Sequence, residues 1–312
     1  MIGNTYQFAW EVSLIEWCQA YIPTFAINAL SAISEIGDTL VVVLLLGFFY
    51  LCFDKRVGKK LMFSTFISLQ ISGGLKNIFK RRRPYFDNEN IECLKVVDNH
   101  YDMYDLLKQG FSFPSMHSSN IVTITGTFYQ EYKKKILLVA SIVISLLVGT
   151  SRFVLGCHYP TDVLAGWLLG IVAVIVVSNL QDKASEKWIY AIILVTTFIG
   201  FFICDSDEFY TICGISIGFI GCCIFDNKYS KFKNTRNIVK CILRLILALV
   251  VFLIFGEGLK LFFSKDVLEA NTLFAHTYRM IRYAIASFTS MGLTPCLYKY
   301  NIFELDDNIK ND

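Results

Sequence analysis

Residues 136–180 read ILLVASIVISLLVGTSRFVLGCHYPTDVLAGWLLGIVAVIVVSNL, and this stretch decides the fold. Two apolar runs within it, 136–153 and 161–180, are each long enough to cross a bilayer as a helix of roughly 20 residues. A short polar connection separates the two runs. The polar side chains in this connection and at the adjoining ends of the runs include Ser151, Arg152, His158 and Asp162. The stretch therefore predicts two membrane helices with reactive and charged side chains gathered at one membrane edge.

The whole chain has a membrane composition. Its 312 residues are 54% hydrophobic and 18% charged, with a mean hydropathy of +0.50, whereas soluble domains carry about 25% charged residues. Nine membrane helices are expected, at 38–53, 61–80, 115–131, 136–153, 161–180, 188–204, 208–225, 239–263 and 276–298. The predicted fold is an all-α, polytopic membrane helical bundle.

Residues 9–34 are less regular than these runs. The polar residues and the proline that interrupt them are Glu11, Glu16, Gln19, Pro23 and Asn28. Either the segment is a helix that lies at the interface, or it forms a tenth span in spite of the cost of carboxylates in hydrocarbon.

Basic residues in short loops predict the orientation. They occupy alternate loops, as Lys55, Arg56, Lys59, Lys60, Lys133, Lys134, Lys135, Lys183, Lys187, Lys228, Lys231, Lys233 and Arg236. Such loops stay on the cytoplasmic side, so the loops with the polar motifs are expected to face outward. The run Lys80-Arg81-Arg82-Arg83 breaks this pattern, and a functional demand for cations there explains it.

Charge and cysteine content exclude several classes. The net charge of +3 is small and the basic residues are confined to short loops, so a nucleic-acid partner has little support. Most of the ten cysteines lie in or beside apolar runs, and neither a C-x2-C pair nor a Cys/His cluster with zinc spacing occurs. No metal site, no cofactor and no disulfide framework is expected.

Lys76 and Arg83 form the first motif, Lys-x6-Arg, followed by Pro84. On a helix, residues seven apart return to nearly the same face, and Pro84 is expected to end that helix. The face would offer an ammonium and a guanidinium to one anion, and arginine can grip two phosphate oxygens. Taken alone, the pair is better explained as ordinary juxtamembrane cations.

The second motif is Pro114-Ser115-Met116-His117. Pro114 stands where a helix can begin, which would place the amides of Ser115, Met116 and His117 in its first turn, where N–H groups bind phosphate. Ser115 adds a hydroxyl, and His117 can supply a proton near neutral pH. An N-cap serine and an interfacial histidine fit the motif equally well.

The third motif is Ser151-Arg152-x5-His158-x3-Asp162. We expect Arg152 at the end of one helix and His158 at the start of the next, with Asp162 on the same face one turn later. A carboxylate there can hold the Nδ1 proton and leave Nε2 as a nucleophile. The alternative is that His158 and Asp162 are only a hydrogen-bonded pair at a helix end, but this does not explain why Arg152 lies beside them.

Together and in this order, the motifs resemble the signature of the type-2 phosphatidic acid phosphatase superfamily, Lys-x6-Arg-Pro, Pro-Ser-Gly-His and Ser-Arg-x5-His-x3-Asp. Met116 stands where glycine is commonest in the family, which leaves its amide in place but reduces the room for a head group. The resemblance covers about residues 36–180 and implies a six-helix core. We therefore expect an N-terminal interfacial or membrane helix at 1–36, a phosphatase core at 37–181 and about four additional transmembrane helices at 187–299.

The resemblance implies a metal-independent membrane lipid phosphatase. His158 is expected to attack phosphorus and form a phosphohistidine, Asp162 to orient it, and His117 to protonate the leaving alkoxide. The residues expected to bind the phosphoryl group are Lys76, Arg83, Ser115, Met116 and Arg152. Two alternatives stay open: a phosphotransferase that uses the same phosphohistidine, and a non-catalytic lipid-phosphate transporter or binding protein.

The expected partners are a lipid phosphate or diphosphate and the bilayer, while the oligomeric state is not predicted. Sequences around the second and third motifs look like bacterial members, which implies the bacterial plasma membrane with the active site on the extracytoplasmic side. The loop 85–113 is acidic and is either a lid or a solvated connection. Arg279 and Arg282, near the outer leaflet, are expected to meet lipid phosphates.

Overall fold

The computed structural model describes residues 3–96 and 101–299. The long helices are α1 (Ala9–Tyr21), α2 (Thr24–Ser34), α3 (Thr39–Phe48), α4 (Lys55–Phe79), α7 (Met116–Tyr132), α8 (Lys135–Val154), α9 (Pro160–Lys183), α10 (Glu186–Ile203), α11 (Asp207–Phe225), α12 (Ile238–Gly258) and α14 (Leu273–Phe288). Shorter helices are α5 (Pro84–Asp87), α6 (Leu106–Gln109) and α13 (Lys265–Glu269). Each predicted apolar run lies largely in a helix, so the all-α membrane bundle is confirmed.

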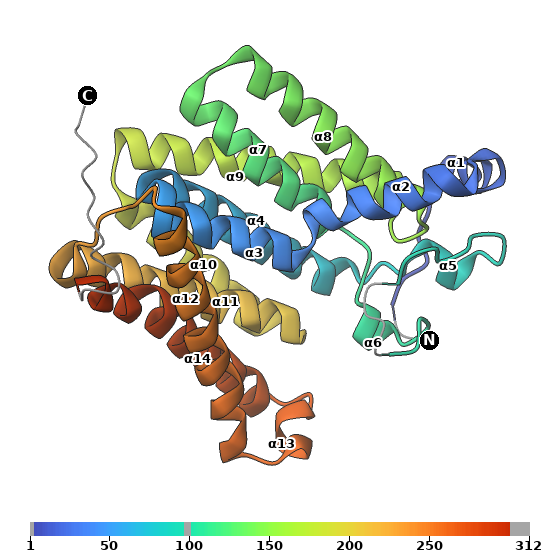
Figure 1. Cartoon of the computed structure of the whole chain (residues 1–312). Helices are drawn as coiled ribbons and strands as arrows, with labels where there is room; N and C mark the ends of the chain where they lie inside the picture. Colours follow the sequence, from blue (N-terminus) through green and yellow to red (C-terminus); the bar gives the residue numbers. More distant parts are fainter. Residues whose placement is uncertain (1–2, 97–100, 300–312) are drawn as a thin grey trace.

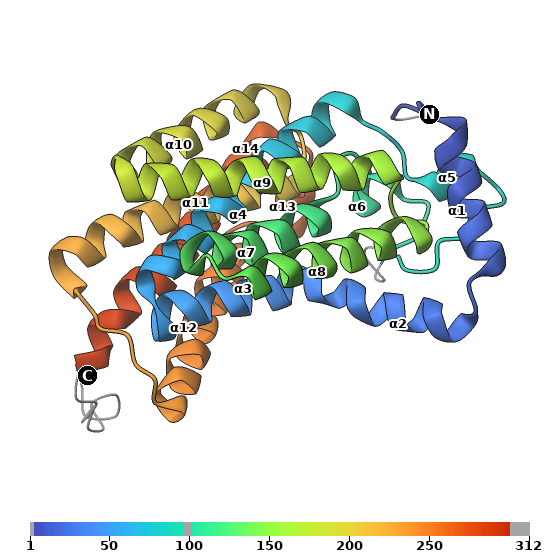
Figure 2. The ribbon, with the colours of Figure 1, turned by 90° about the horizontal axis from the view of Figure 1, so that it is seen from above.

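The bundle is arranged around α4, which packs against α7, α9, α10 and α11. Figure 1 shows α7, α8 and α9 along one side of the bundle and the C-terminal helices on the other. Seen from above, α1, α2 and α5 gather at one end (Figure 2). The three motifs lie at this end, because their residues lie in or next to the last turns of α4 and α8 and the first turns of α7 and α9.

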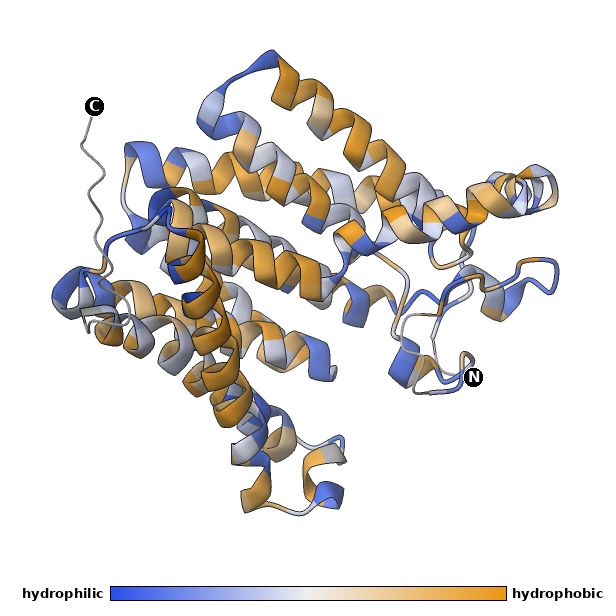
Figure 3. Cartoon of the chain, viewed as in Figure 1, coloured by the Kyte–Doolittle hydropathy of each residue, from blue (hydrophilic) through white to orange (hydrophobic). Residues whose placement is uncertain are grey.

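Within the described residues, five helices are long and apolar enough to cross a membrane: α8, α9, α10, α11 with its extension to Ser230, and α12 with its extension to Phe262. A sixth span results if the helical segments Thr24–Gly37 and Thr39–Phe53, bent by 44°, count as one. Figure 3 shows hydrophobic residues along α8 and α12 and hydrophilic residues at helix ends. Three of the predicted spans contain α helices shorter than the 18 residues that a span requires here: α3 with 10, α7 with 17 and α14 with 16. The long helix α4 is excluded for another reason, since protein surrounds it. Its buried polar residues include Ser64, Ser68, Gln70, Ser72 and Asn77.

The N-terminal segment forms two helices, so the expectation of a single helix over 9–34 is wrong. Proline lacks an amide hydrogen and disfavours helix at the residue before it. Accordingly α1 ends at Tyr21, Ile22 is extended, and α2 starts after Pro23. Glu11 does not face an interface with water, because its side chain is completely buried against other helices.

Ion pairs join the basic loops at the end of the bundle opposite the motifs. Lys55 lies 2.7 Å from Asp226, and Lys59 lies 3.1 Å from Glu186. The buried ammonium of Lys60 contacts Glu131 at 2.5 Å. These contacts bring together the loops at the start of α4 and at the ends of α7, α9 and α11, as the alternating charge pattern requires.

One hydrophobic core joins the N-terminal and C-terminal halves. The ring of Phe219, on α11, lies 5.0 Å from that of Tyr50, 5.3 Å from Phe63 and 5.8 Å from Phe66. All four side chains are buried. The helix α11, together with α10, therefore packs directly on α4.

Candidate functional site

The chain leaves α4 at Phe79, four residues before Arg83. Lys80 has a left-handed backbone with φ 48°, which ends the helix. Arg83 then caps α5, and Pro84 is the first residue of that helix. The prediction that Lys76 and Arg83 share one helical face is therefore wrong, and Arg83 reaches the site through a turn instead.

Backbone carbonyls hold the Arg83 guanidinium in place. Its Nε and Nη2 donate to the carbonyl of Gln109 at 3.1 and 2.8 Å, and Nη1 donates to the carbonyl of Cys157 at 2.8 Å. Nη1 also lies 3.4 Å from Nε2 of His158. Arg83 is only 2% exposed. A fixed cation thus stands directly beside the nitrogen of His158 expected to react.

His158 precedes α9 instead of lying in it. Tyr159 is the N-cap, Pro160 is the first helical residue, and Asp162 accepts a hydrogen bond from the Tyr159 amide at 2.7 Å. This capping box turns the Asp162 carboxylate back toward His158, whose Nδ1 lies 3.5 Å from Oδ2. The distance is too long for a good hydrogen bond, and catalytic hydrogen bonds often tighten only when substrate binds.

The second motif starts α7 one residue later than predicted. Ser115 is the N-cap, and its amide donates to the carbonyl of Asp162 at 3.0 Å, so it is not available for phosphate. Its hydroxyl accepts from the hydroxyl of Ser118 at 2.9 Å. Among the described residues, none accepts a hydrogen bond from the amides of Met116 and His117. These two N–H groups remain in the first turn, where anions bind.

Arg152 and His117 are the remaining predicted residues of the candidate site. Arg152 lies in the last turn of α8 and donates from Nη1 to the hydroxyl of Ser34 at 2.5 Å, while its Nε is buried without a partner. His117 packs against Gly37, where an added Cβ would lie 3.3 Å from the His117 Cβ. Burial lowers the pKa of His117 well below its usual range, and the nearby charges of Arg152, His158, Lys76 and Arg83 lower it further. The three motifs therefore meet at one place.

Burial lowers the pKa of His158 well below its usual range, and the charges of Arg83, Arg152 and Lys76 lower it further. A hydrogen bond with the Ser112 backbone acts in the opposite direction. The imidazole is consequently neutral at neutral pH. A neutral ring with an unprotonated nitrogen is the form that can attack phosphorus.

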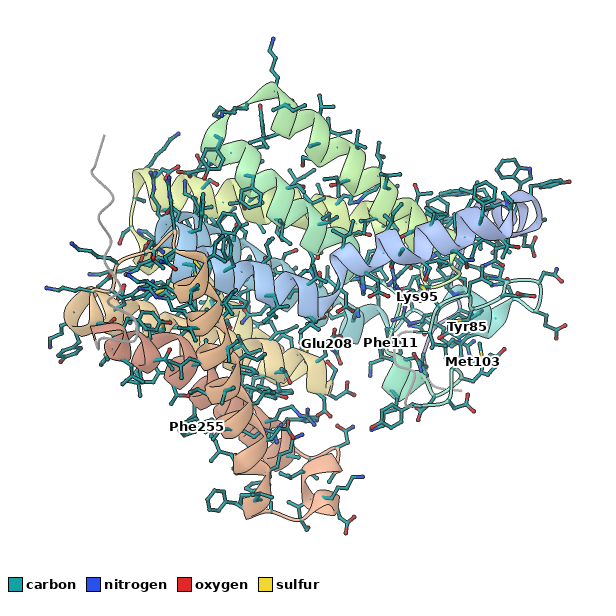
Figure 4. The ribbon with its side chains drawn as sticks, viewed as in Figure 1. Tyr85, Lys95, Met103, Phe111, Glu208 and Phe255 are labelled. Atoms are coloured by element: carbon teal, nitrogen blue, oxygen red, sulfur yellow. The ribbon has the colours of Figure 1, made fainter. Side chains whose placement is uncertain are left out.

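The basic run breaks the charge rule because each of its residues has a partner at this end. Lys80 lies 3.6 Å from Asp205, and Arg82 lies 2.8 Å from Asp87. The ammonium of Lys76, one turn earlier on α4, lies 3.4 Å from Glu208 (Figure 4). Glu208 opens α11, so the C-terminal helices contribute a carboxylate to the candidate phosphate site.

Sequence reasoning missed Arg81 and Glu11. Arg81 donates from Nη1 to Asp162 at 2.7 Å and from Nη2 to Glu11 at 2.6 Å. Glu11 also accepts from the amide and the hydroxyl of Thr161, at 3.0 and 2.6 Å. Glu11 was visible in the sequence as a carboxylate inside an apolar segment, and Arg81 as part of the basic run. Together they fasten α1 to the start of α9.

The loop 85–113 is more than a solvated connection. Tyr85 and Ile91 pack with Ile15 of α1 and with Tyr159 in a small core of their own. The ammonium of Lys95 pairs with Glu35 at 2.6 Å (Figure 4). Asp98, one of its acidic residues, falls outside the described residues. Residues in both described parts of the loop therefore pack on or bond to the bundle, and the carbonyl of Gln109 holds Arg83.

Two family models match the chain. The model of the PAP2 superfamily matches residues 58–186, which contain the three motifs, and the model of the PAP2 superfamily phosphatase transmembrane extension matches residues 210–302. The chain belongs to the PAP2 superfamily. The resemblance seen in the motifs is thereby confirmed, and with the apolar helices it makes the chain an integral membrane protein.

Curated PAP2 relatives match parts of the chain. Phosphatidylglycerophosphatase B of Bacillus subtilis (strain 168) is 36% identical over 86 residues, covering 24% of this chain and 42% of that protein. Undecaprenyl-diphosphatase of Sulfolobus acidocaldarius is 28% identical over 116 residues, covering 37% of this chain and 51% of that protein. The chain thus spans about half or less of the length of these relatives. No solved structure matches it.

Proposed function

We propose that this protein is a membrane lipid phosphatase that works through a phosphohistidine on His158. The observation that carries the proposal is the clamp on the imidazole, with Arg83 3.4 Å from Nε2 and Asp162 3.5 Å from Nδ1. One nitrogen faces a fixed cation that can hold phosphoryl oxygens, and the other faces a carboxylate that can stabilise the imidazolium.

The reaction has two steps. His158 Nε2 attacks phosphorus while the bond from phosphorus to the lipid oxygen breaks. His117 takes up a proton once the negative substrate offsets the charges that lower its pKa, and it donates that proton to the leaving oxygen. Water then attacks the phosphohistidine, gives a proton to His117 and releases inorganic phosphate. The charges of Lys76, Arg83 and Arg152, with the amides of Met116 and His117, would stabilise the negative oxygens in both transition states.

The proposed substrate class is a lipid phosphate monoester or an isoprenyl diphosphate. It is supported by the names of the two relatives, which are a phosphatidylglycerophosphatase and an undecaprenyl-diphosphatase. The three buried cations offer the charge compensation that magnesium supplies in other phosphoryl-transfer enzymes, so we propose a metal-independent reaction. We further propose that the core spans 37–181, that 187–299 is an appended membrane unit, and that the site faces outward from a bacterial plasma membrane.

Phosphate release from a panel of lipid phosphates by purified protein in detergent tests this function. The wild type should release phosphate and form an acid-labile, alkali-stable phosphoenzyme, whereas His158→Ala should do neither while unfolding at the wild-type temperature. Equal labelling of both proteins would remove His158 as the nucleophile. Transfer of label to an added alcohol in preference to water would instead identify a phosphotransferase.

A further inference from the structure

A second basic site lies in the C-terminal helices, apart from the three motifs. It is a cavity of about 410 Å³ between the end of α12, α13 and the face of α14. The charged side chains among its described lining residues are all basic: Lys260, Lys265, Arg279 and Arg282. The sequence pattern explains part of this, because Arg279 and Arg282 are three residues apart and share one helical face.

Arg282 is the unusual member of this set. Only 3% of the surface of Arg282 is exposed, yet its side chain lines the cavity. Its Nε has no hydrogen-bond partner, and no carboxylate among the described residues lies within ion-pair distance. The contact recorded for its guanidinium is with the ring of Tyr283, 5.0 Å away. A buried cation without an anion is costly, so it calls for an explanation.

The neighbouring cations are better compensated. Arg279 lies 2.6 Å from Asp207, and Lys260 lies 2.7 Å from Glu257, although both carboxylates are more than half exposed. Neither carboxylate is among the described residues that line the cavity, so the lining at Arg282 stays positive. An anion that entered the cavity would contact the guanidinium of Arg282 and the ammonium groups of Lys260 and Lys265.

The surroundings of the cavity identify the kind of anion. Leu261 and Phe262, between α12 and α13, are 88% and 73% exposed, and Leu273 and Phe274 at the start of α14 are also exposed. Such apolar residues around a basic pocket are typical of the level where lipid head groups meet acyl chains. The cavity lies toward the end of the bundle that holds the motifs, because Arg279 of its lining pairs with Asp207, which directly precedes Glu208, the partner of Lys76.

We propose that this cavity binds the phosphate group of an anionic phospholipid, with Arg282 as its principal ligand. The site is distinct from the one around His158 and does not depend on the proposed phosphatase reaction. A phosphodiester head group fits the observations, because two oxygens can bridge the guanidinium while the acyl chains lie along the exposed apolar residues.

Binding of dihexanoyl phosphatidylglycerol to the purified full-length protein in detergent tests the proposal. This probe is a phosphodiester, and His158→Ala protein is used so that no turnover intervenes. Arg282→Met should weaken binding by about tenfold or more, as the loss of charged hydrogen bonds requires. Arg236→Met, a matched change at an exposed arginine near the opposite end, and Lys76→Gln should both bind as the parent does.

Thermal unfolding gives a second readout that a merely structural arginine would not produce. Without ligand, Arg282→Met should unfold at a higher temperature than its parent, because it removes an unpaired buried charge. With the probe, the parent should gain stability and the variant should not. Unchanged binding in Arg282→Met, or lower stability without ligand, would overturn the proposal. Equal stabilisation by inorganic phosphate alone would overturn the assignment to a lipid.

Discussion

At the scale of single residues, the imidazole of His158 is held between two unlike neighbours. The carboxylate of Asp162 faces Nδ1, which favours the tautomer with its proton there, and the Arg83 guanidinium faces Nε2, which favours an unprotonated nitrogen. The low pKa of the ring has the same effect. When a phosphate anion enters among the cations, it offsets their charge. The positive charge that develops on the imidazole during attack is then less unfavourable.

The proposed proton donor can be tested through the leaving group. General acid catalysis contributes typically 10²–10⁴-fold, and the contribution shrinks when the leaving oxygen needs no proton. His117→Ala should therefore lose far more activity on an alkyl phosphate lipid than on p-nitrophenyl phosphate, with a diphosphate in between. Single-turnover rates measure this. Equal losses on all three substrates would instead assign His117 to ground-state binding.

Glu208 should compete with substrate for Lys76. The pair is 3.4 Å apart and the Glu208 side chain is 55% exposed, so the interaction is worth less than about 1 kcal/mol. Glu208→Gln should lower KM by about two- to fivefold with little change in kcat. Asp205→Asn is the matched control, because Asp205 is equally exposed but pairs with Lys80. A higher KM in Glu208→Gln would show that the carboxylate helps to bind substrate.

At the scale of elements, α1 fastens the site from outside the matched core. Glu11 and Arg81 form a buried pair that also contacts Asp162, and removing one partner of such a pair costs about 3–5 kcal/mol. Glu11→Gln should therefore lower both the unfolding temperature and kcat, since Arg81 would no longer hold Asp162 in place. Glu16→Gln on the same helix should behave as the wild type. If Glu11→Gln kept full turnover, α1 would have no part in positioning the site.

The approach of α9 to α7 depends on glycine. A Cβ at Gly166 would lie 2.4 Å from the carbonyl oxygen of Ser115, whereas one at Gly74 on α4 would meet nothing within 4 Å. Gly166→Ala should cost about 1–3 kcal/mol of stability by overpacking and should reduce turnover. Gly74→Ala should be neutral or stabilise the protein by up to about 1 kcal/mol. Thermal unfolding and phosphate release, measured on both variants, give the comparison.

The sequence predicts features that depend on neighbouring residues better than features that depend on contacts between residues far apart in the chain. The apolar runs and the three motifs are local patterns, and they sufficed for the helices and for the group around His158. The end of α4 was misplaced, because the left-handed Lys80 is not a residue that marks a helix end in sequence. Arg81 meets Glu11 across 70 residues, and Lys76 meets Glu208 across 132. No single-sequence pattern pairs residues at such separations.

At the scale of the whole molecule, charged side chains gather at both ends of the bundle, with different partners at each end. One end gathers the basic loops with Lys60 buried among carboxylates, and the other holds the motifs and the basic cavity of α14. α4 connects the two ends over 25 residues, or about 37 Å as a helix, which is enough to cross the hydrocarbon core. We propose that the basic loops lie on the cytoplasmic side, where short loops rich in lysine and arginine are retained.

This topology predicts which positions can be labelled from outside the cell. Glu89 and Lys134 are both exposed and lie at opposite ends of the bundle. In a background with Cys93 and Cys296 replaced by alanine, Glu89→Cys should react with an impermeant maleimide in sealed cells. Lys134→Cys should react only after permeabilisation, because its loop is held at the basic end. Reaction of Lys134→Cys in sealed cells, without reaction of Glu89→Cys, would place the candidate site in the cytoplasm and reverse the proposed orientation.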